Sequence, residues 1–302
     1  MMPYTFEEVS SCKNISEAKV KADYKKLCDF EADTNPRKFC GNPTIYQYQM
    51  KNLLNCRRGT KNYKTLQEWF DDPELKEKLW QDAIKRNRRK NAIQPSPTDV
   101  YECHRLNNGA IVPFKASTAK YIYKKFGAKK VLDPTAGWGG RLLGASALGI
   151  DYVGIDTNIN LKEGYEKMIS DLNLKGCEMI WKSCFDVDFK EINPDLVLTS
   201  PPYGDMEIYE HMTPWGGWTA FFYDFMIPLM EKLFKECKCP VCINMSPFMY
   251  EELTKWRQIH DCRKINKERY FPPCDEKIDL RQQMGKQFKT KSQDYIYVWW
   301  SF

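Results

Sequence analysis

The chain has 302 residues, of which 42% are hydrophobic, so it is long enough to bury one large core or two smaller ones. No apolar run reaches the roughly eighteen residues that cross a bilayer, and the N-terminus lacks the apolar centre of a secretory signal. These features predict a folded, soluble, intracellular protein that does not enter a membrane. Its 12 cysteines are scattered without framework spacing, and we expect reduced thiols.

The first part of the chain has a polar, helical pattern. Between about residues 15 and 90, apolar residues recur at helical spacing, with an interruption at Pro73. Residues 91–102 contain two prolines and little apolar periodicity, which predicts a linker. We therefore predict a helical, basic N-terminal region over residues 1–108 and a second domain over residues 109–302.

Basic residues cluster although the net charge of +6 is modest. Such clusters are typical of phosphate contacts, and a solvated helix surface explains them equally well. The candidates are Arg57, Arg58, Lys61, Lys64, Lys85, Arg86, Arg88, Arg89 and Lys90, with Lys286, Lys289 and Lys291 near the C-terminus.

Helical and strand patterns alternate after residue 108. Ser117 is predicted to cap a helix, and the strands VLD, YVGID, CEMIWK and DLVLTS follow, with helices between the first three. A long apolar helix that Pro228 should bend precedes the strand PVCINM, and YIYVWW is a final strand candidate. This alternation predicts an α/β, Rossmann-like fold with a central, mostly parallel sheet and helices on both faces.

A glycine-rich turn, DPTAGWGG, follows the strand VLD and opens a helix. Gly137, Gly139 and Gly140 would let a ligand approach the backbone N–H groups. A pyrophosphate at this turn would be repelled by the carboxylate of Asp133, whereas an amino group and a sulfonium cation would be attracted. Charge complementarity therefore favours S-adenosylmethionine over NAD as the cofactor.

Two further carboxylates follow the next strands. Asp156 ends YVGID, at the offset where an acidic side chain meets ribose hydroxyls in nucleotide-binding α/β folds. Asp186 follows the third strand and could accept a hydrogen bond from an adenine amino group, with Asp188 as a competitor. No metal is required by this chemistry.

The strand DLVLT runs into the turn Ser200-Pro201-Pro202-Tyr203. The lone pair of an exocyclic base amine is delocalised into the ring, so methylation needs acceptors that hold its hydrogens aside. Ser200 Oγ and the Pro201 carbonyl can accept them, and the two prolines stiffen the turn. Tyr203 offers a face on which an extruded base can stack. The turn therefore predicts methyl transfer to a base amine.

Together, LDPTAGWGG and SPPY resemble the first and fourth motifs of the nucleic-acid amino-methyltransferases, over roughly residues 110–302. Their order, with the glycine loop first, is similar to the gamma arrangement. The resemblance implies S-adenosylmethionine as cofactor and a nucleic acid as partner. By position in these motifs, it makes Thr135 a cofactor contact, and it places Phe114, Lys115 and Ser117 at the methionine end of the cofactor.

Serine in the first position of SPPY is associated in this family with cytosine N4, and aspartate with adenine N6. The resemblance therefore favours DNA methylation at cytosine N4, then adenine N6, over RNA. A protein that keeps the fold and binds nucleic acid without catalysis is the main alternative, and an NAD-dependent oxidoreductase is a weaker one. The oligomeric state stays open.

A polar and aromatic stretch follows SPPY and has two interpretations. It could form a mobile loop over the pocket, or its aromatic residues could pack against the next helix. Its members are Asp205, Glu207, Tyr209, His211, Trp215 and Trp218.

Several other patterns do not indicate a catalytic or metal-binding role. Pro272-Pro273-Cys274 lacks the position and the preceding glycines of a C5-cytosine methyltransferase nucleophile. The CKCPVC cluster at residues 237–242 has no nearby fourth zinc ligand, so core thiols are expected. His104 and His260 are expected on the surface.

Overall fold

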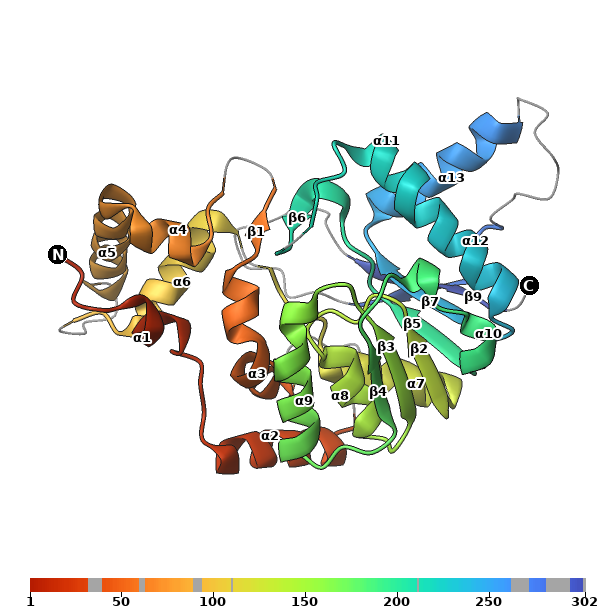
Figure 1. Cartoon of the computed structure of the whole chain (residues 1–302), viewed down its shortest axis with the longest axis horizontal. Helices are drawn as coiled ribbons and strands as arrows, with labels where there is room; N and C mark the ends of the chain where they lie inside the picture. The colour runs from red at the N-terminus through yellow and green to blue at the C-terminus, as the bar shows by residue number, and fades with distance from the viewer. Residues whose placement is uncertain are drawn as a thin grey trace.

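The computed structural model describes residues 1–31, 40–59, 63–88, 94–109, 111–210, 212–261, 272–280 and 294–300 (Figure 1). The N-terminal part contains one short strand among helices: α1 (Phe6–Ser10), α2 (Glu17–Asp29), α3 (Asn42–Leu54), β1 (Arg57–Arg58), α4 (Leu66–Asp71), α5 (Pro73–Arg88) and α6 (Pro97–Asn108). The break between α4 and α5 falls at Pro73, as predicted.

Strands and helices alternate in the remainder of the chain. In order they are α7 (Ala116–Phe126), β2 (Lys130–Asp133), α8 (Gly140–Ser146), β3 (Asp151–Ile155), α9 (Lys162–Asp171), β4 (Cys177–Ile180), α10 (Phe189–Ile192), β5 (Leu196–Thr199), β6 (Glu207–Ile208), α11 (Trp218–Phe221), α12 (Ile227–Glu236), β7 (Val241–Met245), α13 (Pro247–Asp261), β8 (Glu276–Asp279) and β9 (Tyr295–Trp299). Short 3₁₀ turns cover Ile159–Leu161, Cys184–Asp186 and Gly204–Met206.

The central sheet has seven strands in the order β4-β3-β2-β5-β7-β9-β8. Its first five strands are parallel, whereas β9 runs antiparallel to both β7 and β8. The predicted α/β, Rossmann-like architecture with a mostly parallel sheet is therefore confirmed. Strand β8 was not predicted, because the short segment EKID has only one buried apolar side chain.

Helices cover both faces of this sheet, and successive strand residues point to opposite faces. In β5, Leu196 and Leu198 belong to a core shared with α7, α8 and α9, whereas Val197 belongs to a core shared with α12 and α13. Burial on both faces explains why the central strands are continuous apolar runs without polar alternation.

The N-terminal helices have a core of their own, which contains Leu66, Trp69, Leu79 and Trp80. In Figure 1, α4, α5 and α6 lie on the opposite side of the molecule from α11, α12 and α13. Helix α3 joins the two parts, because Met50 and Leu54 pack in the N-terminal core while Ile45 and Leu53 pack in the core beneath the sheet. The division at residue 108 is thus bridged by the two faces of one helix.

Three local expectations need comment. Residues 97–102 were predicted as part of a linker, yet they form the first half of α6, because Ser96 and Asp99 make a capping box and Pro97 occupies the first turn. Ser117 does not cap α7, which begins at Ala116 after Lys115. Near Pro228, a π-helical turn over Phe222–Met226 precedes α12, and such turns accommodate an interrupted hydrogen-bond ladder.

Within the residues described, no helix has the combined length and apolarity that a bilayer crossing requires.

Candidate active site

Strand β2 lies at the point where the sheet order reverses. From β2 the chain adds β3 and β4 on one side, then returns to add β5 and β7 on the other. Ligands of open α/β sheets bind at such a switch point, outside the carboxyl ends of the strands. The glycine loop follows β2 there, and Ser200 follows β5, so the topology alone brings the two sequence motifs to one place.

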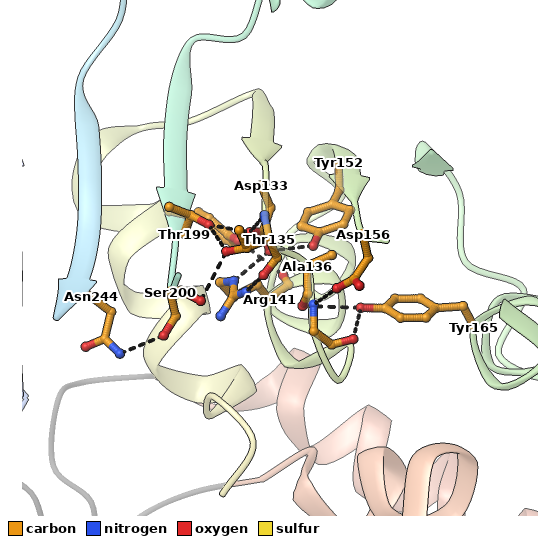
Figure 2. A network of polar contacts seen from close by, with 12 residues as sticks. Asp133, Thr135, Ala136, Arg141, Tyr152, Asp156, Tyr165, Thr199, Ser200 and Asn244 are labelled. Atoms are coloured by element: carbon orange, nitrogen blue, oxygen red, sulfur yellow. Dashed lines mark hydrogen bonds and ion pairs between the residues drawn. The ribbon is translucent and has the colours of Figure 1, made fainter. Parts of the chain in front are cut away.

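A hydrogen-bonded contact joins the two motifs directly (Figure 2). Thr135 Oγ1 lies 2.6 Å from Thr199 Oγ1, and it donates to the carbonyl oxygen of Ser200 at 3.1 Å. Thr135 therefore fixes the distance between the glycine loop and the start of the SPPY turn, although more than sixty residues separate them.

The Asp133 carboxylate, predicted to attract the cofactor, is surrounded by donors from the protein itself. Its carboxylate is fully buried and accepts hydrogen bonds from Arg141 Nε at 2.6 Å, Tyr152 OH at 2.6 Å and Thr199 Oγ1 at 2.9 Å (Figure 2). It does not line the cavity described below. A carboxylate enclosed in this way neutralises Arg141 and ties β2, β3 and β5 together, so its charge is already compensated within the protein.

The three loop glycines serve different purposes. Gly137, with φ +61°, lines the cavity, and a Cβ there would meet no atom closer than 3.9 Å. A Cβ on Gly139 would lie 2.8 Å from Met168 Cε, and one on Gly140 would lie 1.9 Å from the Phe114 carbonyl oxygen. Only Gly137 thus leaves space for a ligand, whereas Gly139 and Gly140 are required by the packing of the protein on itself. Among the three, Gly139 does not line the cavity.

Asp156 lies beside the glycine loop at the end of β3. Its Oδ2 accepts from the backbone N–H of Gly137 at 2.8 Å, and its Oδ1 accepts from that of Asn158 at 2.9 Å. Burial raises the pKa of the Asp156 carboxyl to about 6, although these two hydrogen bonds act in the opposite direction. The carboxylate lines the cavity and is positioned to accept from a ligand hydroxyl.

One large cavity, of about 1920 Å³, extends over the carboxyl ends of β2 and β5. Sites for single small molecules usually measure about 300–1,000 Å³, so this one has room for a cofactor and part of a second substrate. The predicted site residues that line it are Phe114, Lys115, Thr135, Gly137, Asp156, Ser200, Pro201, Pro202 and Tyr203. Those that do not are Ser117, Asp133, Gly139 and Asp186.

Ser117 and Asp186 lie elsewhere for identifiable reasons. Ser117 is buried inside the first turn of α7. Asp186 is exposed and borders a separate, smaller depression, whereas the cavity wall after β4 is made by its neighbours Ser183, Cys184 and Phe185. Within the 3₁₀ turn over Cys184–Asp186, the first two residues line the cavity and Asp186 does not.

Tyr203 is held by polar neighbours from two other segments of the chain. Asn244, at the end of β7, donates from Nδ2 to Tyr203 OH at 3.2 Å and to Ser200 Oγ at 3.0 Å. Burial, reinforced by the neighbouring Asp294 carboxylate, raises the pKa of the Tyr203 phenol well above its ordinary value. The ring therefore stays neutral across the physiological pH range and lines the cavity beside Ser200.

The stretch after SPPY packs against the following helices. Asp205 accepts from the backbone N–H groups of Trp215 and Gly217 at 2.6 and 2.9 Å, which closes the segment into a compact loop. Trp215 and Trp218 both contact the ring of Phe221 edge-on. These contacts favour the packing interpretation over the mobile loop, and both tryptophans also line the cavity. His211 lies outside the described residues.

The N-terminal region supplies one wall of the cavity. Strand β1 pairs antiparallel with β6, so Arg57 lies opposite Ile208 and Arg58 opposite Glu207. Burial raises the pKa of the Glu207 carboxyl, and the Arg58 guanidinium opposes part of this shift. Arg58 also lines the cavity. Other residues that the N-terminal region contributes to this wall are Lys13, Asn42, Tyr46 and Arg105. The cavity is thus lined by both parts of the chain.

The basic cluster on α5 is only partly described. Lys85 is exposed and lies 3.9 Å from Asp82, a surface pair of the kind that adds little stability. Arg89 and Lys90 lie outside the described residues, as do Lys61, Lys286, Lys289 and Lys291.

The cysteine cluster at residues 237–242 and His104 are both buried. Cys237, Cys239 and Cys242 are buried free thiols, and the described residues bring no three His, Cys, Asp or Glu side chains together as a metal site. His104 is buried, not exposed as predicted, because its ring packs edge-on against Trp69 and bonds the Lys64 carbonyl. Burial lowers the pKa of His104 to about 4. The side chain of His260 lies outside the described set.

Sequence reasoning missed Arg141 and Asn244. Both line the cavity and both stand in otherwise apolar segments, RLLGA and VCINM. A charged or amide side chain inside a buried apolar run is a signal of a polar partner, and it could have identified both residues.

Neither a protein-family model nor a curated protein matches the sequence. Among solved structures, the chain aligns with TrmN from Thermus thermophilus at 12% identity and a TM-score of 0.40, over 63% of this chain and 49% of that one. It aligns with an RNA methyltransferase from Salinibacter ruber, in complex with S-adenosyl-L-homocysteine, at 16% identity and a TM-score of 0.38, over 63% and 94% of the two chains. A human methyltransferase 10 domain containing protein aligns at 13% identity and a TM-score of 0.40, over 61% and 80%. The chain therefore spans about half the length of the first of these proteins.

Proposed function

We propose that this protein transfers a methyl group from S-adenosylmethionine to an exocyclic amino group of a nucleic-acid base. One observation carries the proposal. The glycine loop and the SPPY turn, joined through Thr135, Thr199 and the Ser200 carbonyl, face one cavity at the switch point of the sheet. A donor and an acceptor of a methyl group need this arrangement, because the reacting atoms must meet within about 3–3.5 Å.

The cofactor half of the cavity fits an adenosyl sulfonium. Asp156 would accept from its ribose hydroxyls, and Gly137 leaves space for close approach to the backbone. Phe114 and Lys115 line the wall next to the Arg141 guanidinium, which sits 5.2 Å from the centre of the Phe114 ring. When bound, the cofactor supplies an electrophilic methyl carbon. Asp133 has no part in this contact, because its partners lie within the protein.

The target half provides acceptors and a stacking face. In the proposal, Ser200 Oγ and the Pro201 carbonyl oxygen accept hydrogen bonds from the two N–H groups of the amine. The lone pair of the amine nitrogen then faces the methyl carbon. Pro202 stiffens the turn that holds both acceptors. Tyr203 stacks on the base, and stacking of this kind contributes about 1–3 kcal/mol. The nitrogen forms its bond to carbon as the carbon–sulfur bond breaks, and the amine then releases one proton to solvent.

Among the described residues, no contact distinguishes DNA from RNA, so the preference for DNA drawn from the resemblance is not supported. The proposal therefore names a base amine in DNA or RNA, with cytosine N4 and adenine N6 as the targets that the resemblance of SPPY implies. The experiment is to incubate the protein with isotopically labelled S-adenosylmethionine and separate pools of DNA and RNA. Digestion and mass spectrometry then identify the methylated nucleoside.

A protein that binds nucleic acid without catalysis is the competing function. Isothermal titration with S-adenosylmethionine separates the two, because a binding module has no need of the cofactor. Heat of binding together with a labelled nucleoside supports the proposal. Absence of both, with nucleic-acid binding retained, would leave the competing function.

A further inference from the structure

Asn244 is a buried amide in an apolar strand, beside the proposed target site. It stands near the end of β7, between Ile243 and Met245, and only 7% of its surface is exposed. It lines the cavity together with Ser200 and Tyr203. Figure 2 shows its side chain directed toward that of Ser200. No motif assigns a role to this position.

The hydrogen bonds of Asn244 are one-sided. Its Nδ2 donates to Ser200 Oγ at 3.0 Å and to Tyr203 OH at 3.2 Å, whereas its buried Oδ1 has no hydrogen-bond partner. Leaving a buried acceptor unpaired costs free energy, and an apolar side chain in this strand would avoid that cost. An asparagine kept only for stability would bond through both ends of its amide. The two N–H donors are therefore what this position provides.

The neighbouring groups fix the direction of these bonds. Asp294 raises the pKa of Tyr203 through a side-chain hydrogen bond, so the phenol donates to that carboxylate. Its oxygen must then accept from Asn244, which orients the amide with Nδ2 toward both hydroxyls. Ser200 also forms a side-chain hydrogen bond with Tyr203, and because the single phenolic hydrogen already goes to Asp294, the Ser200 hydroxyl must donate in that bond. The Ser200 oxygen has two lone pairs, and Asn244 occupies one of them.

We propose that Asn244 is a positioning residue that sets Ser200 as a fixed acceptor for the target amine and holds Tyr203 in its stacking orientation. This inference rests on the proposed function. With one lone pair bound to Asn244 and its hydrogen directed to Tyr203, Ser200 presents its remaining lone pair to the cavity. The arrangement selects a target that donates hydrogens, which is what an exocyclic amine does and a ring nitrogen with only a lone pair does not.

The test replaces Asn244 with leucine, which keeps a similar volume and removes both donors. We expect kcat at saturating labelled S-adenosylmethionine to fall about 10- to 100-fold, because loss of geometry near the reacting atoms has effects of this size. The Kd for the cofactor should stay within about twofold, because no recorded bond joins Asn244 to the glycine loop or Asp156. Tm should not fall, because the substitution also removes the unpaired oxygen. Asn244→Ala serves as the second variant if leucine does not fit.

Asn108 provides the matched control. It is another buried asparagine, but it bonds through both ends, to the Trp69 indole, the Lys64 backbone N–H and the His104 carbonyl, and it does not line the cavity. Asn108→Leu should lower Tm while kcat, measured well below Tm, is retained. A purely structural Asn244 would behave in the same way as this control.

The outcomes separate the two proposals. Transfer by the wild-type protein with unchanged kcat in both Asn244 variants would overturn the positioning role alone. Equal losses of Tm and cofactor binding in both variants would overturn it as well. If the wild-type protein transfers no methyl group to DNA or RNA, the proposed function fails and this inference fails with it.

Discussion

Replacing Asp133 with asparagine distinguishes a structural role of this residue from a ligand role. The carboxylate is fully buried and pairs with Arg141 at 2.6 Å, and it also accepts from Tyr152 and Thr199. The amide removes the negative charge but nearly keeps the shape. Arg141, which is only 3% exposed, is then left as a buried cation without its counter-charge.

The size of the effect follows from the burial of the pair. Removing one partner of a buried ion pair costs about 3–5 kcal/mol. Each kcal/mol shifts the Tm of a domain of 150–250 residues by roughly 2–4 °C, and residues 109–302, which contain the pair, are in this size range. We therefore expect Asp133→Asn to lower Tm by roughly 6–20 °C. Cofactor binding measured well below that Tm should change less than about threefold, because Asp133 does not line the cavity.

The assay combines differential scanning calorimetry with isothermal titration of S-adenosylmethionine. Adding Arg141→Met to Asp133→Asn should recover part of the lost stability, because the double variant no longer buries an unpaired charge. An unchanged Tm with cofactor affinity weakened tenfold or more would refute this reasoning. It would restore the interpretation of Asp133 as the ligand of the cofactor's amino group.

Three further predictions concern the cavity. Because the pKa of Asp156 is raised to about 6, its ionised form is lost below that pH. The cofactor Kd should therefore rise about tenfold between pH 7 and pH 5. Asp156→Asn should abolish this pH dependence, as measured by titration calorimetry. Tyr203→Ala should reduce kcat strongly and spare cofactor binding, and equal losses of both would count against a stacking face. Gly140→Ala would place a Cβ 1.9 Å from the Phe114 carbonyl oxygen, so we expect a lower Tm and weaker cofactor binding. Gly149→Ala is the control, because its Cβ would meet no atom within 4 Å and only the modest cost of a positive φ is expected.

Much of the fold could be predicted because its signals are local. The strand–turn–helix around Gly137, the buried runs of β5 and β7, and the break at Pro73 are each specified by fewer than about fifteen consecutive residues. The SPPY turn is likewise a local pattern with local stiffness. The linker prediction was wrong for residues 97–102, because proline marks the first turn of a helix as readily as a linker, and the capping pair Ser96 and Asp99 decides between them.

Most partners of the polar residues could not be predicted, because they come from other elements of the fold: Asp133 binds Tyr152 of β3 and Thr199 of β5 as well as Arg141, eight residues away on α8. The amino-acid sequence alone determined that a glycine loop and an SPPY turn end two strands, and that Asp133 and Asp156 are acidic. Only the tertiary structure decided that Asp133 pairs with Arg141 and accepts a hydrogen bond from Tyr152, while Asp156 lies at the cavity wall. It also brought Asn244 to Ser200 across 44 residues and Arg58 to the wall of the cavity. A carboxylate's function depends on which donors surround it, and strand order, which no local pattern encodes, selects those donors.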